Sequence, residues 1–314
     1  MNDSDHPLRG VLCGIAGAVS WGVSGTCSQF LFQYYEVSSI WLTAFRMVTA
    51  GAVLLVICFL AEKKKAAGIL RSPADVRNLL IFAVFGLILN QLSYLSAIRY
   101  SNAGTATVLQ SISIVLIAVI TTLAARHLPG RAQITAIVLV LTGVFLISTQ
   151  GDVHTLSITP KGLFWGLTSA GGVVSYSFLS IPLIEKWNSR LVTGYGMLIG
   201  GIIFTIATRS FYIPALDLRG WAFIAGVVLL GAVLGYTLFL KCIHDLGSLD
   251  GNLLAPIEPV TATILTAAFL HTKFTVPDLL GFASILGAVV LINMADRKKA
   301  KRVVSETHFP QKLS

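Results

Sequence analysis

One carboxylate stands inside a long apolar stretch of this sequence, where ionised side chains are rare. Glu258 lies between Pro256 and Pro259 in the segment 251–270. An ionised group within a membrane costs several kcal/mol unless it faces water or a partner, so its presence predicts a transport role, including coupling to protons. The competing interpretation is structural: each proline frees a backbone carbonyl four residues earlier, and Glu258 helps to satisfy it. In either case Pro256 and Pro259 predict a kinked or locally opened helix, which is useful for gating.

A second charge and a set of polar and aromatic residues also lie in apolar runs. Arg46 is about two turns from the end of the segment 39–60. It could attract a substrate carboxylate, although a snorkelling side chain paired with backbone or lipid headgroups explains it equally well. The other residues predict a cavity lining that binds substrate, or alternatively contacts between helices. These candidate lining residues are Trp21, Ser24, Asn90, Gln91, Tyr94, Thr107, Gln110, Tyr176, Tyr236 and Asn252.

The composition places these residues in a membrane. Of 314 residues, 55% are hydrophobic and 12% charged, and the mean hydropathy is +0.80, which leaves too little polar surface for a water-soluble fold. No nucleotide-binding, hydrolase or metal-ligand motif occurs, so we expect no cofactor, no metal and no enzymatic activity. The net charge of +9 comes mostly from short connections, which indicates topology and not a nucleic-acid partner. The expected partners are a small-molecule substrate, protons and membrane lipids, for a monomer or homodimer.

Apolar runs of about 20 residues predict ten transmembrane helices in an all-α integral membrane protein. If the N-terminus is cytoplasmic, 17 of the 23 Lys and Arg residues fall on the cytoplasmic side and 5 on the other. This bias predicts a multi-pass membrane protein with both termini cytoplasmic. The predicted spans are 10–32, 39–60, 79–98, 103–124, 132–149, 162–184, 191–208, 221–240, 251–270 and 276–295.

The first half of the chain resembles the second. With an offset of about 152 residues, Gly10, Gly14 and Ala18 fall on small residues of the sixth span, so both halves begin with a helix that allows close packing. Five spans per half is an odd number, so the second copy must enter the membrane from the opposite side. We therefore predict two inverted five-helix repeats, at 8–150 and 161–296, followed by a basic cytoplasmic tail at 297–314.

Four sequence segments carry a family resemblance that covers about residues 8–296. They are Ala18–Gly22 (AVSWG), Arg46, Asn102–Ala106 (NAGTA) and Ile257–Val260 (IEPV). On these residues the chain resembles the EamA family of the drug/metabolite transporter superfamily, in particular bacterial inner-membrane members of undefined substrate. The resemblance implies ten helices in two repeats and export of small metabolites such as amino acids, often coupled to ions or protons.

The chain also departs from the pattern of that family. Where many members have a Gly-Glu pair at the ends of the fourth and ninth helices, this chain has Arg126-His127 and His271-Thr272, and it has Ser113-Ile114 in place of the first Glu-Pro. Any coupling role of those glutamates is therefore not carried over to this chain.

Together these features favour a secondary active transporter that exports small metabolites, such as amino acids or related compounds, by alternating access. An importer of a sugar or amine is one alternative. An integral membrane enzyme acting on lipid-linked substrates is another, but such an enzyme normally clusters its acids and histidines at one interface, and the carboxylates here are scattered.

Overall fold

Helices form almost all of the chain in the computed structural model, which describes residues 5–66, 68–150, 158–246 and 254–307. The described residues contain no strand. The helices of the first half are α1 (Asp5–Tyr34), α2 (Ser39–Ala66), the 3-10 helix η1 (Gly68–Arg71), α3 (Pro73–Ile81), the π-helix η2 (Phe82–Ile88), α4 (Leu89–Tyr100), α5 (Ala103–Ala124) and α6 (Arg131–Thr149). Those of the second half are α7 (Pro160–Ile184), α8 (Ser189–Thr208), α9 (Leu218–Gly226), the π-helix η3 (Val227–Leu234), α10 (Gly235–Leu246), α12 (Ile257–Leu270) and α13 (Val276–Thr307).

The number and apolar character of these helices confirm the predicted fold class. Nine helical segments of the described residues are long and apolar enough to cross a membrane, with α3, η2 and α4 forming one of them and α9, η3 and α10 another. The tenth apolar helix, α12, has only 14 residues. Its predicted span, 251–270, therefore differs from the structure: the described helix starts at Ile257, after a turn at 254–256, and residues 251–253 lie outside the described residues.

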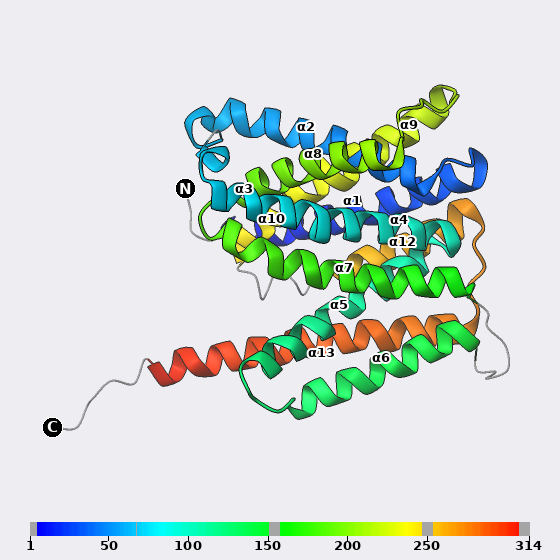
Figure 1. Cartoon of the computed structure of the whole chain (residues 1–314). Helices are drawn as coiled ribbons and strands as arrows, with labels where there is room; N and C mark the ends of the chain where they lie inside the picture. The colour runs from blue at the N-terminus through cyan, green and yellow to red at the C-terminus, as the bar shows by residue number, and fades with distance from the viewer. Residues whose placement is uncertain (1–4, 67, 151–157, 247–253, 308–314) are drawn as a thin grey trace.

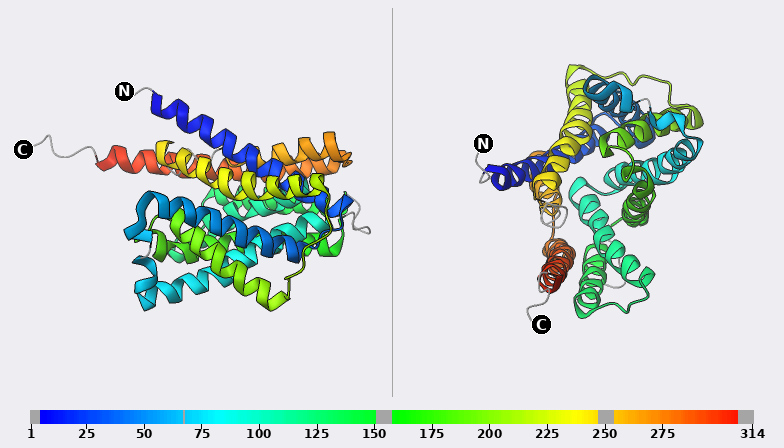
Figure 2. Two further views of the ribbon diagram at one scale, coloured as in Figure 1. Left: turned by 90° about the horizontal axis from the view of Figure 1, so that it is seen from above. Right: turned by 90° about the vertical axis from the view of Figure 1, so that its left-hand side faces the viewer.

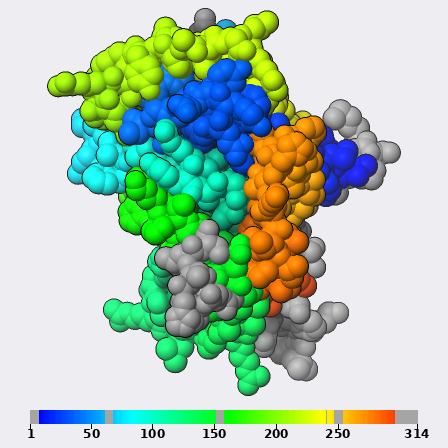
Figure 3. All heavy atoms as spheres, turned by 90° about the vertical axis from the view of Figure 1, so that its right-hand side faces the viewer, coloured from blue at the N-terminus to red at the C-terminus, as the bar shows by residue number. Residues whose placement is uncertain are grey.

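The helices form one bundle with α6 and α13 paired along one side (Figure 1). The start of α1 and the end of α13 lie at the same end of the bundle (Figures 1 and 2), which we call the terminal end. The opposite end, the far end, carries the end of α1, the turn between α4 and α5, and the connection from α12 to α13 (Figure 3). Helices α5 and α12 lie between the α6–α13 pair and the larger group of helices.

The two halves repeat each other down to the irregularities of single helices. The π-helices η2 and η3 start 145 residues apart, and each contains a glycine at the equivalent position, Gly86 and Gly231. Packing also corresponds, because α1 packs on α10 and α12 as α7 packs on α4 and α5. With five apolar helices per half, these matches confirm the predicted inverted repeat.

Small residues bring the helix backbones close together, as the spacing predicts. On α1, a Cβ atom added at Gly14 would lie 2.5 Å from Cδ1 of Leu254 and 2.6 Å from Sγ of Cys242. Between α6 and α13, a Cβ at Gly143 would lie 2.7 Å from the carbonyl oxygen of Gly281. These distances are well below van der Waals contact, so larger side chains cannot enter without moving a helix.

We expect Gly14→Leu to lower the stability of the folded protein, because the added side chain must displace α10 or the turn before α12. Overpacking of this kind costs about 1–3 kcal/mol. The measurement is the thermal unfolding midpoint of purified protein in detergent. Gly171→Leu is the matched control, because no atom lies within 4 Å of a Cβ at Gly171 on the exposed face of α7. Equal midpoints for the two variants would show that Gly14 faces lipid.

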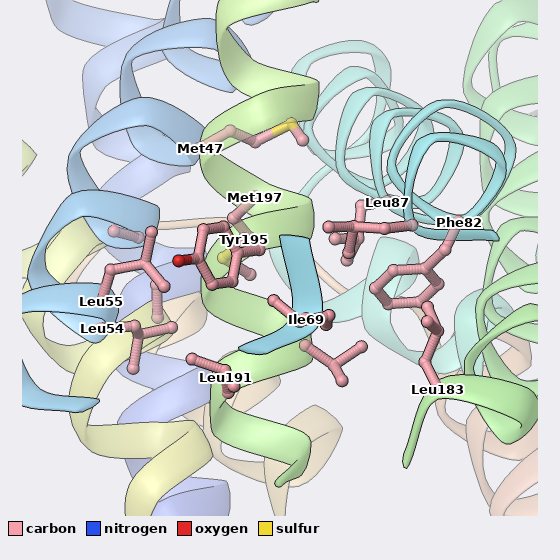
Figure 4. Packing of buried hydrophobic residues seen from close by; sticks show 14 of the residues in the cluster. Met47, Leu54, Leu55, Ile69, Phe82, Leu87, Leu183, Leu191, Tyr195 and Met197 are labelled. Carbon is pink, nitrogen blue, oxygen red and sulfur yellow. The ribbon is translucent and has the colours of Figure 1, made fainter. Parts of the chain in front are cut away.

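A large apolar cluster fixes the positions of α2, α8 and η2 relative to each other (Figure 4). Met47 from α2, Met197 from α8, and Phe82 and Leu87 from η2 are completely buried in it. Arg46 precedes Met47 directly in the chain, so this cluster holds the segment of α2 that carries the arginine.

Candidate functional site

A cavity of about 330 Å³ lies in the middle of the bundle, between the two halves of the chain. Seven helices contribute to its wall: α1, α2, α4, α5, α7, α10 and α12. Its volume is at the lower end of the range of about 300–1,000 Å³ that is typical of ligand pockets. The lining residues are Trp21, Arg46, Asn90, Gln91, Tyr94, Gln110, Val173, Tyr176, Tyr236, Phe239, Ile243 and Glu258.

The aromatic part of the wall is held in place by the π-helix η3. Trp21 Nε1 donates a hydrogen bond of 2.8 Å to the carbonyl oxygen of Gly231. A π-helical turn breaks the regular α-helical hydrogen-bond pattern, and such turns occur frequently at functional sites. The indole of Trp21 also contacts the ring of Tyr236 edge-on, with 5.4 Å between centroids, and that of Phe239 at 4.9 Å. Trp21 is therefore a fixed wall of the cavity.

Arg46 points into the cavity and is buried, with 5% of its surface exposed. A Cβ at Gly231 would lie 2.9 Å from Nη2, so the guanidinium packs against the π-helix η3. Its Nε and Nη1 atoms are buried and have no hydrogen-bond partner among the described residues. Buried polar groups are normally hydrogen-bonded, so these two donors are an exception within the described part of the chain, and they belong to a residue that lines the cavity.

Glu258 lies in the first turn of α12 and also faces the cavity. The hydroxyl of Tyr94 is close enough to interact with its carboxyl group, and Arg46 is within electrostatic range. Among the described residues no ion pair joins Arg46 and Glu258. The cavity thus offers a guanidinium and a carboxyl group to a ligand, with aromatic rings around them.

The two prolines beside Glu258 are at the start of α12, at and directly after the turn at 254–256. Pro256 is the N-cap of α12, and Pro259 lies in its first turn. Backbone N–H groups in a first turn have no intrahelical acceptor, so a proline there breaks no hydrogen bond. The predicted kink or local opening at these prolines therefore stays a prediction: the described part of the span is a turn at 254–256 followed by a helix that begins next to the cavity.

The polar candidates divide into two groups. Asn90 and Gln110 line the cavity and bind each other, with Gln110 Nε2 donating to Asn90 Oδ1 at 3.2 Å. Ser24 and Thr107 are buried outside the lining: Ser24 Oγ donates to the carbonyl of Val227, and Thr107 Oγ1 donates to that of Ala103. Tyr94 and Tyr176 both line the cavity, whereas Asn252 lies outside the described residues.

Val173, Phe239 and Ile243 line the cavity but were absent from the predicted set, although the internal repeat could have indicated Phe239. With the offset of 145 residues, Gln91 and Tyr94 of α4 correspond to Tyr236 and Phe239 of α10, and all four line the cavity. Equivalent helices of the two repeats thus present equivalent positions to the same space. Val173 and Ile243 are apolar, so their residue type gave no such signal.

Comparison with known proteins gives consistent matches over nearly the whole length. The family described as the EamA-like transporter family matches residues 8–149 and 160–294. The uncharacterized inner membrane transporter YicL of Salmonella typhimurium is 35% identical over 93% of this chain and 98% of its own length. The uncharacterized transporter YyaM of Bacillus subtilis is 22% identical over 86% of this chain and 87% of its own. A crystal structure of a protein with 18% sequence identity superimposes with a TM-score of 0.60 and covers 95% of this chain and 99% of its own. This similarity concerns the fold alone.

Proposed function

We propose, because the chain belongs to the EamA-like transporter family, that it exports small amino-acid-like metabolites by alternating access. As a member of this family with many apolar helices, it is a multi-pass inner membrane protein. The observation that carries the proposal is Arg46, a buried residue that lines the cavity and whose Nε and Nη1 donors have no hydrogen-bond partner among the described residues. The bidentate geometry of a guanidinium matches that of a substrate carboxylate.

The rest of the cavity supports a substrate with a second polar group and an apolar body. Glu258 supplies a negative charge for an ammonium group or for a proton, and Gln110 and Asn90 supply amide groups. Trp21, Tyr176 and the other rings give the apolar body a wall to pack against. A volume of about 330 Å³ has room for a single small metabolite.

The distribution of Lys and Arg residues and the carboxyl group of Glu258 support the proposed direction of transport and its coupling to protons. The start of α1 and the end of α13 share one end of the bundle, and the predicted cytoplasmic excess of Lys and Arg assigns this end to the cytoplasm. The repeats at 8–150 and 161–296 would then move relative to each other around the cavity. We further propose that protons and substrate use Glu258 in turn, so that the inward proton gradient drives export.

Counterflow in liposomes tests this function. The full-length protein is purified, placed in liposomes preloaded with a mixture of unlabelled amino acids, and exposed to a trace of each labelled amino acid in turn. We expect saturable accumulation of at least one of them above that in protein-free liposomes. Accumulation that does not saturate, or hydrolysis of added lipid-linked substrates without counterflow, would contradict the proposal.

A further inference from the structure

We propose that Gln29 closes the central cavity toward the far end of the bundle, as a releasable bridge between three helices. Gln29 lies on α1 and is buried, with 2% of its surface exposed. Its Oε1 accepts a hydrogen bond of 2.8 Å from the backbone N–H of Ala103, the first residue of α5. Its Nε2 donates a bond of 2.9 Å to Oγ1 of Thr272, directly after α12. The inference rests on the proposed alternating access, in which one end must be closed while the other is open.

The bridge lies beyond the cavity on each of the three helices. On α1, Trp21 lines the cavity, and Gln29 follows about two turns later. On α5, Gln110 lines the cavity, and Ala103 lies about two turns nearer the far end. On α12, Glu258 lines the cavity at the start of the helix. Thr272 lies beyond the opposite end of that helix, directly after the C-cap.

The space between the cavity and the bridge is filled by close packing. A Cβ at Gly25 of α1 would lie 3.0 Å from the hydroxyl oxygen of Tyr94 and 3.5 Å from Cβ of Ala103. A Cβ at Gly104 of α5 would lie 2.7 Å from Oγ1 of Thr263 on α12. A substrate in the cavity therefore meets packed helices in this direction, and the bridge lies beyond them. Figure 3 shows this far end, where α1, the turn before α5 and the connection after α12 meet.

The bonds of Gln29 can break without unwinding a helix. The N–H of Ala103 belongs to the first turn of α5, where backbone donors have no acceptor within the helix. The acceptor Thr272 lies in a connection, after His271 with its left-handed φ of 52°. Both partners thus lie at helix ends that can separate from α1 as rigid parts.

Other polar contacts join helices at the terminal end: Arg9 on α1 pairs with Asp245 on α10, and Lys186 after α7 pairs with Asp75 on α3. The repeat offset of 152 places Ile181 of α7 at the position of Gln29, and Ile181 is apolar and 43% exposed. Helix α1 contacts α5 near the bridge, whereas no comparable packing joins the repeat-related pair α7 and α12 in the described residues. Ile243 continues the cavity lining along α10 toward the terminal end. The bridge at the far end therefore depends on a residue that is polar in only one repeat.

Accessibility of a single cysteine tests the bridge. Thr107→Cys places a thiol one turn from Ala103, between bridge and cavity, in a protein whose four native cysteines are replaced by serine. The thiol is labelled with a membrane-impermeant methanethiosulfonate, and protease cleavage of a terminal tag establishes which side of the vesicles carries the termini. We expect Gln29→Leu to raise the labelling rate from the far side by about fivefold or more, since both hydrogen bonds of the bridge are lost.

Two further variants separate this effect from misfolding. Gln33→Leu makes the same change one turn later on the exposed face of α1 and should leave the labelling rate as it is without the substitution. Thr272→Val removes one of the two bonds and should raise the rate by a smaller factor, so the test stands even where Gln29→Leu does not fold. Unchanged labelling in Thr272→Val and Gln29→Leu, in a protein that still shows counterflow, would overturn the bridge and leave the proposed function standing. Increased labelling in a protein without counterflow of any amino acid would support the bridge as a closure and count against the proposed function.

Discussion

Glu258→Gln abolishes transport driven by a pH gradient and leaves substrate exchange measurable: this is the result we expect if the cavity couples protons to substrate. Glutamine keeps the shape and the hydrogen-bonding capacity of the side chain but cannot be ionised. Glu258 faces the cavity beside Tyr94 and within electrostatic range of Arg46, so its charge affects any ligand there. Export against a concentration gradient should fall below about a tenth of the unmodified rate, whereas counterflow at equal pH needs no change of protonation.

The measurement compares two assays on the same liposome preparation: uptake after an imposed pH jump, and counterflow with the same pH on both sides. Glu185→Gln is the matched control, because Glu185 is exposed at the end of α7, away from the cavity lining. Gradient-driven transport that survives in Glu258→Gln would reduce Glu258 to a structural role at the start of α12.

The second large effect is expected for substitutions of Arg46, which we propose binds the carboxylate of the substrate. Arg46→Met keeps most of the length of the side chain and removes the guanidinium, so a substrate carboxylate loses its charged partner. Hydrogen bonds to charged groups contribute about 1.5–3 kcal/mol, which corresponds to about a 10- to 100-fold weaker apparent affinity. The apparent affinity of Arg46→Lys should lie between that of the unmodified protein and that of Arg46→Met, because an ammonium group retains the charge without the bidentate geometry.

A substrate ester provides the specific readout for Arg46. We expect the apparent affinity for the methyl ester of a transported amino acid to be similar in the unmodified protein and in Arg46→Met, because the ester has no carboxylate for the guanidinium to bind. Arg77→Met, on the exposed face of α3, controls for the loss of a positive charge. If Arg46→Met lost apparent affinity equally for the amino acid and for its ester, Arg46 would support the fold of the cavity and not the recognition of its ligand.

The membrane spans, the repeat and the main lining residues could be predicted from sequence because each depends on local composition. A charge or an aromatic ring within an apolar run stands out, as Arg46, Trp21 and Glu258 do, and the structure places all three on one cavity. Gln29 lies in an apolar run too, but its role depends on two partners distant in sequence, Ala103 and Thr272. Nothing in the spacing around Gln29 indicates them.

The start of α12 and the π-helices escaped prediction for a different reason. Proline within an apolar run predicts a kink if the helix continues and a helix start if it does not, and the sequence near Pro256 allows both. A π-helix differs from an α-helix only by the acceptor that each N–H selects, and tertiary contacts such as the bond from Trp21 to Gly231 stabilise that choice. Hydrophobic patterns do not report these contacts.

The matched π-helices η2 and η3 set the rotational phase of the helices that follow them. A π-helical turn holds about one residue more than an α-helical turn, and each residue of an α-helix advances the side-chain direction by about 100°. Without that surplus residue in η2, Asn90 and Tyr94 of α4 would turn away from the cavity although no side chain had changed, and the same holds for Tyr236 after η3. The chemistry of the cavity is thus encoded partly in residue count: a one-residue deletion in either π-helix is a change of binding site, whereas the same deletion in a loop only shortens a connection.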